Sequence, residues 1–334
     1  MAVKDKVVLV LGAGASYNYG FPTAKELREE INRFDFDKLL KDQNYYPQSI
    51  KLISEGLNLI RNNFYESNIF SIDAWLAIEE NIIAREAGKY VITALLTKCE
   101  ERSIVEYVNP FNRDRIPIFK DRDSYTVNDW YSILFNNIVK TAKKLEDFAE
   151  DAKNLSIITF NYDQSLEAYF QKSIKKAYYG KNDKDYVKQL NNIRILHVYG
   201  KIRPYQSDIS FWGYNSDPNN IYERSKDIKI IPEVREESEE LKEIKSIIKE
   251  ADKIFFIGFS YDEENLKKLG IPDTFQIKEK KVYGTSIGLY EGEVKKIKTL
   301  IRGTRIPSKY SLNLQAESQE AFNFFREKVI EIFT

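Results

Sequence analysis

The chain has a single imidazole side chain, and its place in the sequence makes it a candidate reactive group. His197 is the only histidine among the 334 residues, and it lies near the end of the apolar run 193–198. Imidazole is the side chain whose charge changes nearest neutral pH, so His197 is the natural general base for a hydroxyl or a water. A lone histidine also serves as a hydrogen-bonded structural residue, and the sequence leaves both interpretations open.

An amide and a carboxylate follow the apolar run 155–160. They belong to Asn161 and Asp163. Ligands of open α/β sheets bind beyond the carboxyl ends of the strands, so these side chains are placed to hold a substrate or a water. Asp163 also precedes a helical pattern at 164–170, and capping that helix is the structural alternative.

A glycine-rich segment follows the first apolar run, 6–11. Glycines there permit a tight turn and a close approach of the backbone to a ligand, and N–H groups at a helix start favour phosphate. The segment is not the full dinucleotide fingerprint, because Tyr17 occupies the third glycine position of G-x-G-x-x-G. A plain turn between strand and helix is the alternative. The candidate phosphate contacts are Gly12, Ala13, Gly14, Ala15 and Ser16.

Two more turns of the same kind follow later apolar runs. Gly258 and Ser260 come after 253–257, and Thr285 and Ser286 come after 281–283. Each turn alone is compatible with an ordinary connection. All the candidate segments lie at the ends of apolar runs, so they can line a single crevice at one edge of the sheet.

The apolar runs themselves predict the fold. Continuous runs rich in β-branched residues are typical of strands buried on both faces of a parallel sheet. They alternate with helical patterns such as 264–269 and 291–301, which predicts an α/β fold with a Rossmann-like, doubly wound parallel sheet. The predicted strands are 6–11, 155–160, 193–198, 253–257 and 281–283.

The stretch between the first two predicted strands has a helical character. Apolar residues recur there at spacings of three and four, with almost no strand-like run. This predicts a large α-helical insertion after the first strand, with a loop at 109–129. The expected organisation is a Rossmann-type domain formed by 1–24 and 154–334, with 25–153 as the helical subdomain. The predicted helical segments are 23–34, 50–64, 71–102 and 127–151.

Composition limits the possible classes of function. The 51 Lys and Arg residues balance 51 Asp and Glu residues, which argues against a global attraction to nucleic acid or an anionic membrane. One Cys and one His cannot build an internal disulfide, a cysteine-based zinc module or a multi-histidine metal site. The longest apolar run, 7–15, is shorter than the roughly 20 residues of a membrane span. We expect a cytoplasmic protein with no metal and no direct nucleic-acid or membrane partner.

The order of these segments resembles the sirtuin-like NAD-binding fold. Sirtuins carry a Gly-Ala-Gly-Ile/Ala-Ser loop, a Gly-Ile-Pro element, Gln-Asn-Ile-Asp, His-Gly and a Gly-Thr/Ser-Ser turn. This chain has GAGAS, GFPT, FNYD, HVYG and GFS in the same order, in short islands over 6–24 and 155–290. The resemblance implies NAD as the ligand, and it adds Pro22 and Thr23 to the candidate cofactor contacts.

The departures from sirtuins point to a narrower group. The chain cannot build the four-cysteine zinc ribbon of sirtuin deacylases. It is more similar to the sirtuin-like NADases of bacterial antiphage defence, which cleave NAD⁺ to nicotinamide and ADP-ribose. This resemblance implies NAD⁺ as substrate and a toxic effector in abortive infection. It also implies a homo-oligomer gated by a partner such as a HerA-type ATPase.

The resemblance assigns a hypothetical role to each candidate residue. Asn161 would hold the ribose hydroxyls or the attacking water, Asp163 would contact the nicotinamide carboxamide, and His197 would accept a proton. The loop 12–16 would hold the pyrophosphate. The contacts near the phosphates, the adenosine ribose and the adenine would be Gly258, Ser260, Thr285 and Ser286.

Other functions stay open at this level. A protein deacylase or an ADP-ribosyltransferase would use NAD⁺ differently, and a non-catalytic module would only sense NAD or ADP-ribose. The segment that carries Asp73 and Trp75 is also ambiguous. Ser71 or Asp73 caps a helix there, or the segment covers the nicotinamide pocket.

Overall fold

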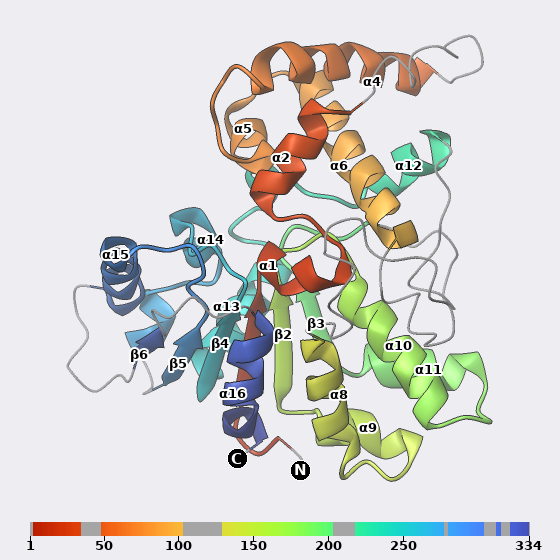
Figure 1. Cartoon of the computed structure of the whole chain (residues 1–334), viewed down its shortest axis with the longest axis vertical. Coiled ribbons are helices and arrows are strands. Elements are labelled where there is room, and N and C mark those ends of the chain that lie inside the picture. Colours follow the sequence, from red (N-terminus) through yellow and green to blue (C-terminus); the bar gives the residue numbers. More distant parts are fainter. Residues whose placement is uncertain are drawn as a thin grey trace, which may run out of the picture.

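The computed structural model describes residues 3–34, 48–102, 129–202, 218–276, 280–303, 312–314 and 321–333. Its centre is a six-stranded parallel sheet in the order β3-β2-β1-β4-β5-β6 (Figure 1). The chain builds outward from β1 to β3, and then crosses over to β4 on the other side of β1. This is the doubly wound strand order, with its switch point between β1 and β4. The predicted fold class is confirmed.

All five predicted strands are present, with ends shifted by two residues or fewer. Every residue of the central strands β1 and β4 is buried, because parallel sheets are covered on both faces. The short strand β6 was missed, since three residues are too few to show a pattern. The strands are β1 (Val7–Leu11), β2 (Leu155–Thr159), β3 (Arg194–His197), β4 (Lys253–Ile257), β5 (Lys281–Gly284) and β6 (Leu312–Leu314).

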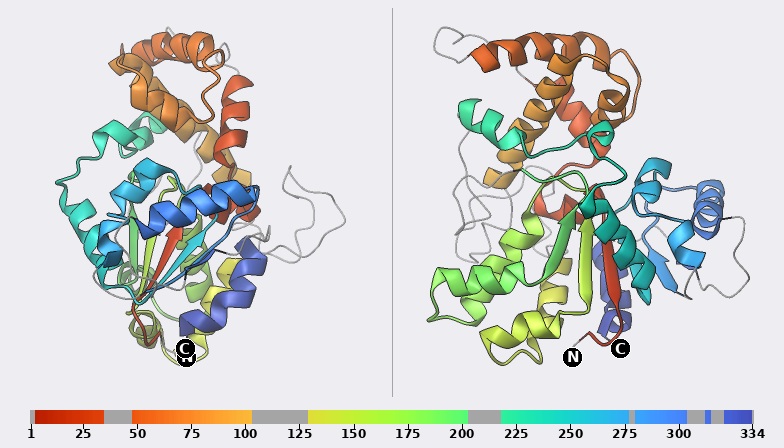
Figure 2. Two further views of the ribbon diagram at one scale, coloured as in Figure 1. Left: turned by 90° about the vertical axis from the view of Figure 1, so that its left-hand side faces the viewer. Right: turned by 180° about the vertical axis from the view of Figure 1, so that it is seen from behind.

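Helices cover both faces of the sheet. Figures 1 and 2 show α8 (Trp130–Val139) and α16 (Ala321–Phe333) on one face and α13 (Glu239–Glu250) on the other. Helix α13 begins at Ser238, whose hydroxyl accepts the N–H of Leu241. Four apolar side chains of α13 are buried: Leu241, Ile244, Ile247 and Ile248.

A second group of helices stands beyond the carboxyl ends of the strands (Figure 1). It contains α2 (Ala24–Asn32), α4 (Gln48–Leu59), α5 (Ile72–Ile78) and α6 (Ile82–Arg102), which contact one another. Helix α12 (Pro218–Ser225) joins this group through Arg224, which donates to Glu100 of α6 at 2.6 Å. Helices α8 and α9 (Leu145–Asp151) instead pack beside the sheet, against α16, α10 and α11. The helices predicted to form one subdomain at 25–153 therefore lie in two places, one group beyond the carboxyl ends of the strands and the other beside the sheet.

The predicted helical segment 71–102 is two helices. Helix α5 ends at Glu79, whose ψ of 128° is extended. Asn81 then starts α6, because its side-chain oxygen accepts the N–H groups of Ile83 and Ala84. The segment 127–151 is divided in the same way into α8 and α9. The predicted loop at 109–129 lies outside the described residues except for Asp129.

The remaining elements connect the strands. They include π-helix and 3-10 segments at the ends of longer helices. None of the helices in the described residues is long and apolar enough to span a membrane. These elements are α1 (Ala13–Ser16), η1 (Tyr17–Tyr19), η3 (Ile60–Phe64), α10 (Ser165–Ala177), α11 (Asp183–Asn191), η4 (Ile231–Glu233), α14 (Glu263–Lys268), η5 (Asp273–Gln276) and α15 (Glu291–Arg302).

Candidate functional site

The turns that follow β1 and β4 touch each other at the switch point. A Cβ on Gly12 would lie 2.5 Å from the Gly258 carbonyl oxygen, and one on Gly14 would lie 2.9 Å from the Gly258 Cα. Gly258 itself has a φ of +57°, in the left-handed region. These three glycines are therefore required for the two turns to pack together, whatever else the turns bind.

Some N–H groups of the glycine-rich loop are already used within the protein. Gly14 N–H donates to the Gly258 carbonyl at 3.0 Å, and Ala15 N–H donates to the Gly12 carbonyl at 2.9 Å. The indole N–H of Trp130 in α8 holds the same loop by donating to the Ala15 carbonyl at 2.8 Å. The amides of Gly14 and Ala15 would have to exchange these bonds to hold a phosphate.

Ser16, Asn161 and Asp163 form one hydrogen-bonded group at the carboxyl edge of the sheet. The Asn161 amide nitrogen donates to the Gly12 carbonyl at 3.0 Å and to Ser16 Oγ at 3.2 Å. The Ser16 hydroxyl donates in turn to Asp163 Oδ2 at 3.0 Å. Asp163 Oδ1 accepts the N–H of Ser165, the first residue of α10, at 3.0 Å, but the N-cap residue of that helix is Gln164 and not Asp163. The loop after β1 and the loop after β2 are thus joined through side chains.

His197 lies at the end of β3 with both ring nitrogens engaged. Nδ1 is 2.9 Å from the Asn161 carbonyl oxygen, and Nε2 is 2.7 Å from Glu167 Oε1. A carbonyl only accepts, so Nδ1 carries a hydrogen and donates it. The Glu167 side chain is 6% exposed and the His197 side chain 5%. Lys201 Nζ lies 3.8 Å from the same carboxylate oxygen.

The two carboxylates of the site have opposite pKa shifts. Burial raises the pKa of Glu167. The charge and hydrogen bond of His197 and the charge of Lys201 have the opposite and larger effect, so the pKa of Glu167 lies below its ordinary value. Burial also raises the pKa of Asp163, and its hydrogen bonds from Ser165 and Ser16 offset only part of that effect. Glu167 is therefore held as the anion more strongly than Asp163.

A small cavity lies between these groups. Its volume is about 10 Å³, which is close to the least space that holds one water. Asn161, Asp163, Glu167 and the ring of Tyr131 are among the residues that line it. An amide and two carboxylates therefore line one small space together with apolar side chains such as Leu11 and Ile157.

The turns after β4 and β5 contain three more predicted cofactor contacts, Ser260, Thr285 and Ser286. Thr285 Oγ1 accepts the Gly258 N–H at 2.8 Å, and the Thr285 carbonyl accepts the Tyr261 hydroxyl at 2.8 Å. Ser286 is buried beside it, whereas Ser260 is exposed at the turn after β4. The turns after β4 and β5 are thus fixed to each other.

Pro22 and Thr23 stand at the start of α2. The Thr23 hydroxyl accepts the Glu26 N–H at 3.4 Å, and the Glu26 carboxylate accepts the Thr23 N–H at 2.9 Å. This is a capping box, which stabilises the first turn of the helix. The Thr23 side chain is therefore used locally, and its predicted contact with a cofactor stays a prediction.

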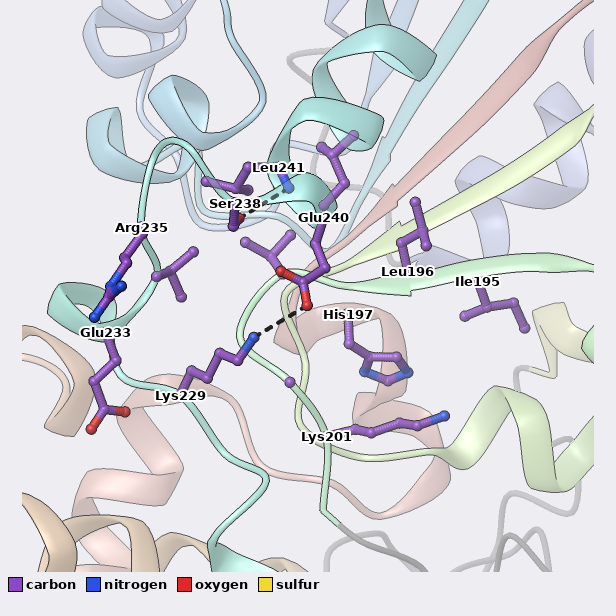
Figure 3. Close-up of a pocket in the computed structure, with 14 residues that line it drawn as sticks. Ile195, Leu196, His197, Lys201, Lys229, Glu233, Arg235, Ser238, Glu240 and Leu241 are labelled. Atoms are coloured by element: carbon purple, nitrogen blue, oxygen red, sulfur yellow. Dashed lines mark hydrogen bonds and ion pairs between the residues drawn. The ribbon is translucent and has the colours of Figure 1, made fainter. Parts of the chain in front are cut away.

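A larger cavity of about 360 Å³ opens beside His197, between β3 and α13. Figure 3 shows His197 and Lys201 along the cavity, with Lys229 joined to Glu240 at 3.6 Å. Arg235 adds a further positive charge. The size is within the range of small-molecule sites. Its apolar lining residues are Ile195, Leu196, Val198, Val234, Leu241 and Ile244.

The fold and this site define an α/β protein with a polar cluster at the carboxyl edge of its sheet. A family model described as a SIR2-like domain matches residues 155–270. The match runs from β2 through α14 and includes Asn161, Asp163, His197 and Gly258. It supports a sirtuin-like family, whose members are typically NAD-dependent enzymes, and therefore NAD-related activity in general. No curated protein matched the chain.

The structure adds one site residue that the sequence reasoning missed. Glu167 lies four residues after Asp163, in the first turn of α10, and this spacing was the available signal. It was overlooked because an acidic residue in the first turn of a helix is usually a solvated helix-dipole partner. In the described residues no group of three or more His, Cys, Asp and Glu side chains is arranged to hold a metal ion.

Proposed function

We propose that the chain hydrolyses NAD⁺ to nicotinamide and ADP-ribose at the carboxyl edge of the sheet. The observation that carries this proposal is the connected group of Ser16, Asn161, Asp163, His197 and Glu167. It joins the loop after β1 to the ends of β2 and β3, where doubly wound folds bind their ligands. The SIR2-like match over 155–270 supports NAD⁺ as the substrate.

The amide of Asn161 is oriented for contact with the substrate. Its nitrogen donates to the loop after β1. Because these bonds fix the plane of the amide, the direction of its oxygen Oδ1 is fixed as well. In the proposed reaction Oδ1 accepts a hydrogen bond from a ribose hydroxyl or from the attacking water.

The carboxylates suit a reaction that builds positive charge on the ribose. Cleavage of the nicotinamide–ribose bond passes through an oxocarbenium-like state, and nicotinamide leaves as a neutral molecule that needs little acid assistance. Asp163 and Glu167 are buried carboxyl groups beside Asn161, so their negative charge would act in a medium of low polarity. They stabilise the developing cation in this mechanism, while water attacks C1′.

His197 and Glu167 act together in the proposed mechanism. With Nδ1–H donated to Asn161, one proton lies between Nε2 and the Glu167 carboxylate. His197 can accept a proton from substrate only when Nε2 exchanges this carboxylate for a ribose hydroxyl or a water. The shared proton leaves to solvent in this exchange, so Glu167 stays an anion near the imidazolium that forms, although, unlike the carboxylate of a catalytic triad, it no longer bonds the ring.

The test is nicotinamide release from NAD⁺ by the purified chain over a series of protein concentrations. We compare the wild type with His197→Ala and Asn161→Ala, and use Lys295→Gln, an exposed residue of α15, as the matched control. The proposal predicts release by the wild type and the control, with a loss of about 10²–10⁴-fold in His197→Ala. Release by all variants alike would contradict the assigned site.

Both ring nitrogens of His197 already make hydrogen bonds within the protein. This favours one alternative, a module that binds NAD⁺ without turnover. It predicts measurable NAD⁺ binding and no nicotinamide release at any protein concentration. Transfer of ADP-ribose to protein is a further alternative, and label from NAD⁺ on protein would identify it. Protein deacylation would require an acyl-lysine substrate and is tested by deacylation of an acetylated peptide.

The proposed biological role is that of a toxic effector in antiphage defence. Support for this role comes from the resemblance of the sequence to sirtuin-like NADases. It includes a homo-oligomer and a gating partner such as a HerA-type ATPase. Cellular NAD⁺, measured during phage infection with wild-type or His197→Ala protein, should fall only with the wild type.

A further inference from the structure

A partly buried hydrogen bond connects the helical group above the sheet to the Asn161–Asp163 turn. The hydroxyl of Tyr162 donates to Asp73 Oδ1 at 2.7 Å. Asp73 lies in the first turn of α5, but Ser71 caps that helix by accepting the Ala74 N–H. The Asp73 carboxylate is therefore not used as a cap, and it points at the loop after β2.

Tyr162 ties together three parts of the protein. Its side chain is 7% exposed, and its hydroxyl also lies 3.3 Å from the Lys229 carbonyl oxygen, in the segment that walls the larger cavity. The Tyr162 carbonyl accepts the Ile202 N–H at 3.0 Å, just beyond β3. Helix α5 also packs against η4, which follows Lys229. The position of α5 is thus linked to the turn and to the cavity wall.

The peptide groups beside Tyr162 belong to the proposed reaction centre. The Asn161 carbonyl is the acceptor for His197 Nδ1, and the Asn161 amide points toward the loop after β1. Asp163, on the other side, accepts from Ser16. A rotation of the backbone at Tyr162 would therefore move the partner of His197 and both neighbouring side chains together.

We propose that Asp73 and Tyr162 are positioning residues, which hold the Asn161–Asp163 turn in its reactive orientation and make turnover depend on the position of α5. This inference rests on the proposed NAD⁺ hydrolysis. Neither side chain needs to touch the substrate. Burial raises the pKa of Asp73 despite the Tyr162 hydrogen bond, as expected for a carboxyl held away from water.

Three substitutions separate this hydrogen bond from packing. Tyr162→Phe keeps the buried ring and removes only the hydroxyl. Asp73→Leu keeps the number and branching of the side-chain heavy atoms and removes the acceptor, whereas Asp73→Asn retains an acceptor oxygen and should rescue the function. Tyr178→Phe is the matched control. The Tyr178 hydroxyl also donates a hydrogen bond, to the Ala142 carbonyl at 2.6 Å, but it does so near α9 and away from the Asn161–Asp163 turn.

The test measures NAD⁺ turnover and amide hydrogen exchange on the full chain. We expect Tyr162→Phe and Asp73→Leu to lower kcat by about tenfold to a hundredfold with little change of KM, because a small misplacement of catalytic groups costs rate. Asp73→Asn and Tyr178→Phe should keep kcat near the wild-type value. The double variant Asp73→Leu/Tyr162→Phe should be no slower than the slower single variant. Exchange in the peptide 158–166 should accelerate in the two impaired single variants.

Two results would overturn the inference. One is an unchanged kcat and unchanged exchange in Tyr162→Phe and Asp73→Leu while the wild type is active. The other is an equal loss of kcat in Tyr178→Phe, which would mean that the contact between Tyr162 and Asp73 contributes only to the general stability of the fold. If the wild type releases no nicotinamide, the proposed function fails, and the exchange measurement alone then decides whether Asp73 orders the turn through Tyr162.

Discussion

Replacing Glu167 by Gln would show whether His197 works as one half of a proton-sharing pair. The two side chains meet at 2.7 Å and are almost completely buried, while His197 Nδ1 remains on the Asn161 carbonyl. A glutamine amide can still hydrogen-bond Nε2, but it carries no negative charge to pair with an imidazolium. We therefore expect the ring to keep its place while Nε2 loses its negatively charged partner.

The size of the effect follows from this geometry. A positioned general base contributes about 10²–10⁴-fold to a rate, so kcat of Glu167→Gln should fall by about that factor. One neutral hydrogen bond replaces the pair, and the free energy of unfolding should change by about 1 kcal/mol. Glu167→Ala would leave His197 without this partner and should cost more, about 3–5 kcal/mol if the imidazole stays charged.

The same variant has a pH signature. Burial raises the pKa of Glu167, but His197 and Lys201 together leave it below its ordinary value in the folded chain. A carboxyl with a lowered pKa stabilises the fold above its unfolded pKa and loses that contribution as the pH falls through the folded value. Urea unfolding at pH values from about 6 down to about 3 should therefore show a steeper loss of stability in the wild type than in Glu167→Gln.

Steady-state nicotinamide release and urea unfolding are the assays for Glu167→Gln. A variant with wild-type kcat would refute the pairing of His197 and Glu167 in the reaction. A variant whose stability falls as steeply as that of the wild type would refute the lowered pKa.

Three further substitutions test how the scaffold holds the site. Gly12→Ala places a Cβ 2.5 Å from the Gly258 carbonyl oxygen and should lower the free energy of unfolding by about 1–3 kcal/mol, measured by urea titration. Arg224→Met leaves the fully buried carboxylate of Glu100 without its 2.6 Å partner and should cost about 3–5 kcal/mol; an unchanged melting temperature would be inconsistent with that. Trp130→Phe removes the indole N–H that holds the loop after β1 and also part of a fully buried ring, so it should cost about 2–4 kcal/mol; a loss below about 1 kcal/mol would contradict both roles.

The parallel sheet could be predicted because its strands carry a strong local signal. β1 and β4 are continuous apolar runs, each followed by a glycine turn, and burial on both faces requires that composition. The break between α5 and α6 could not be predicted in the same way. Apolar spacing continues across it, and the break depends on the Asn81 cap.

The candidate site was only partly accessible from the sequence. Asn161 and His197 were found because they follow strands, and the structure brings them to 2.9 Å through the Asn161 carbonyl. Glu167 was missed, since its burial depends on how α10 packs on the sheet. Asp73 was considered as a cap, but its contact with Tyr162 spans 89 positions and is set by tertiary packing. No local pattern encodes that distance.

Hydrolysis of NAD⁺ in ¹⁸O-labelled water is the most direct test of the central claim. The purified chain is incubated with NAD⁺ over a series of protein concentrations, and the products are resolved by mass spectrometry. The proposed reaction predicts equal amounts of nicotinamide and ADP-ribose, with one ¹⁸O at C1′ of the ribose, and formation of this product about 10²–10⁴-fold more slowly by His197→Ala. Intact NAD⁺ at every concentration, or ADP-ribose without the label, would contradict it.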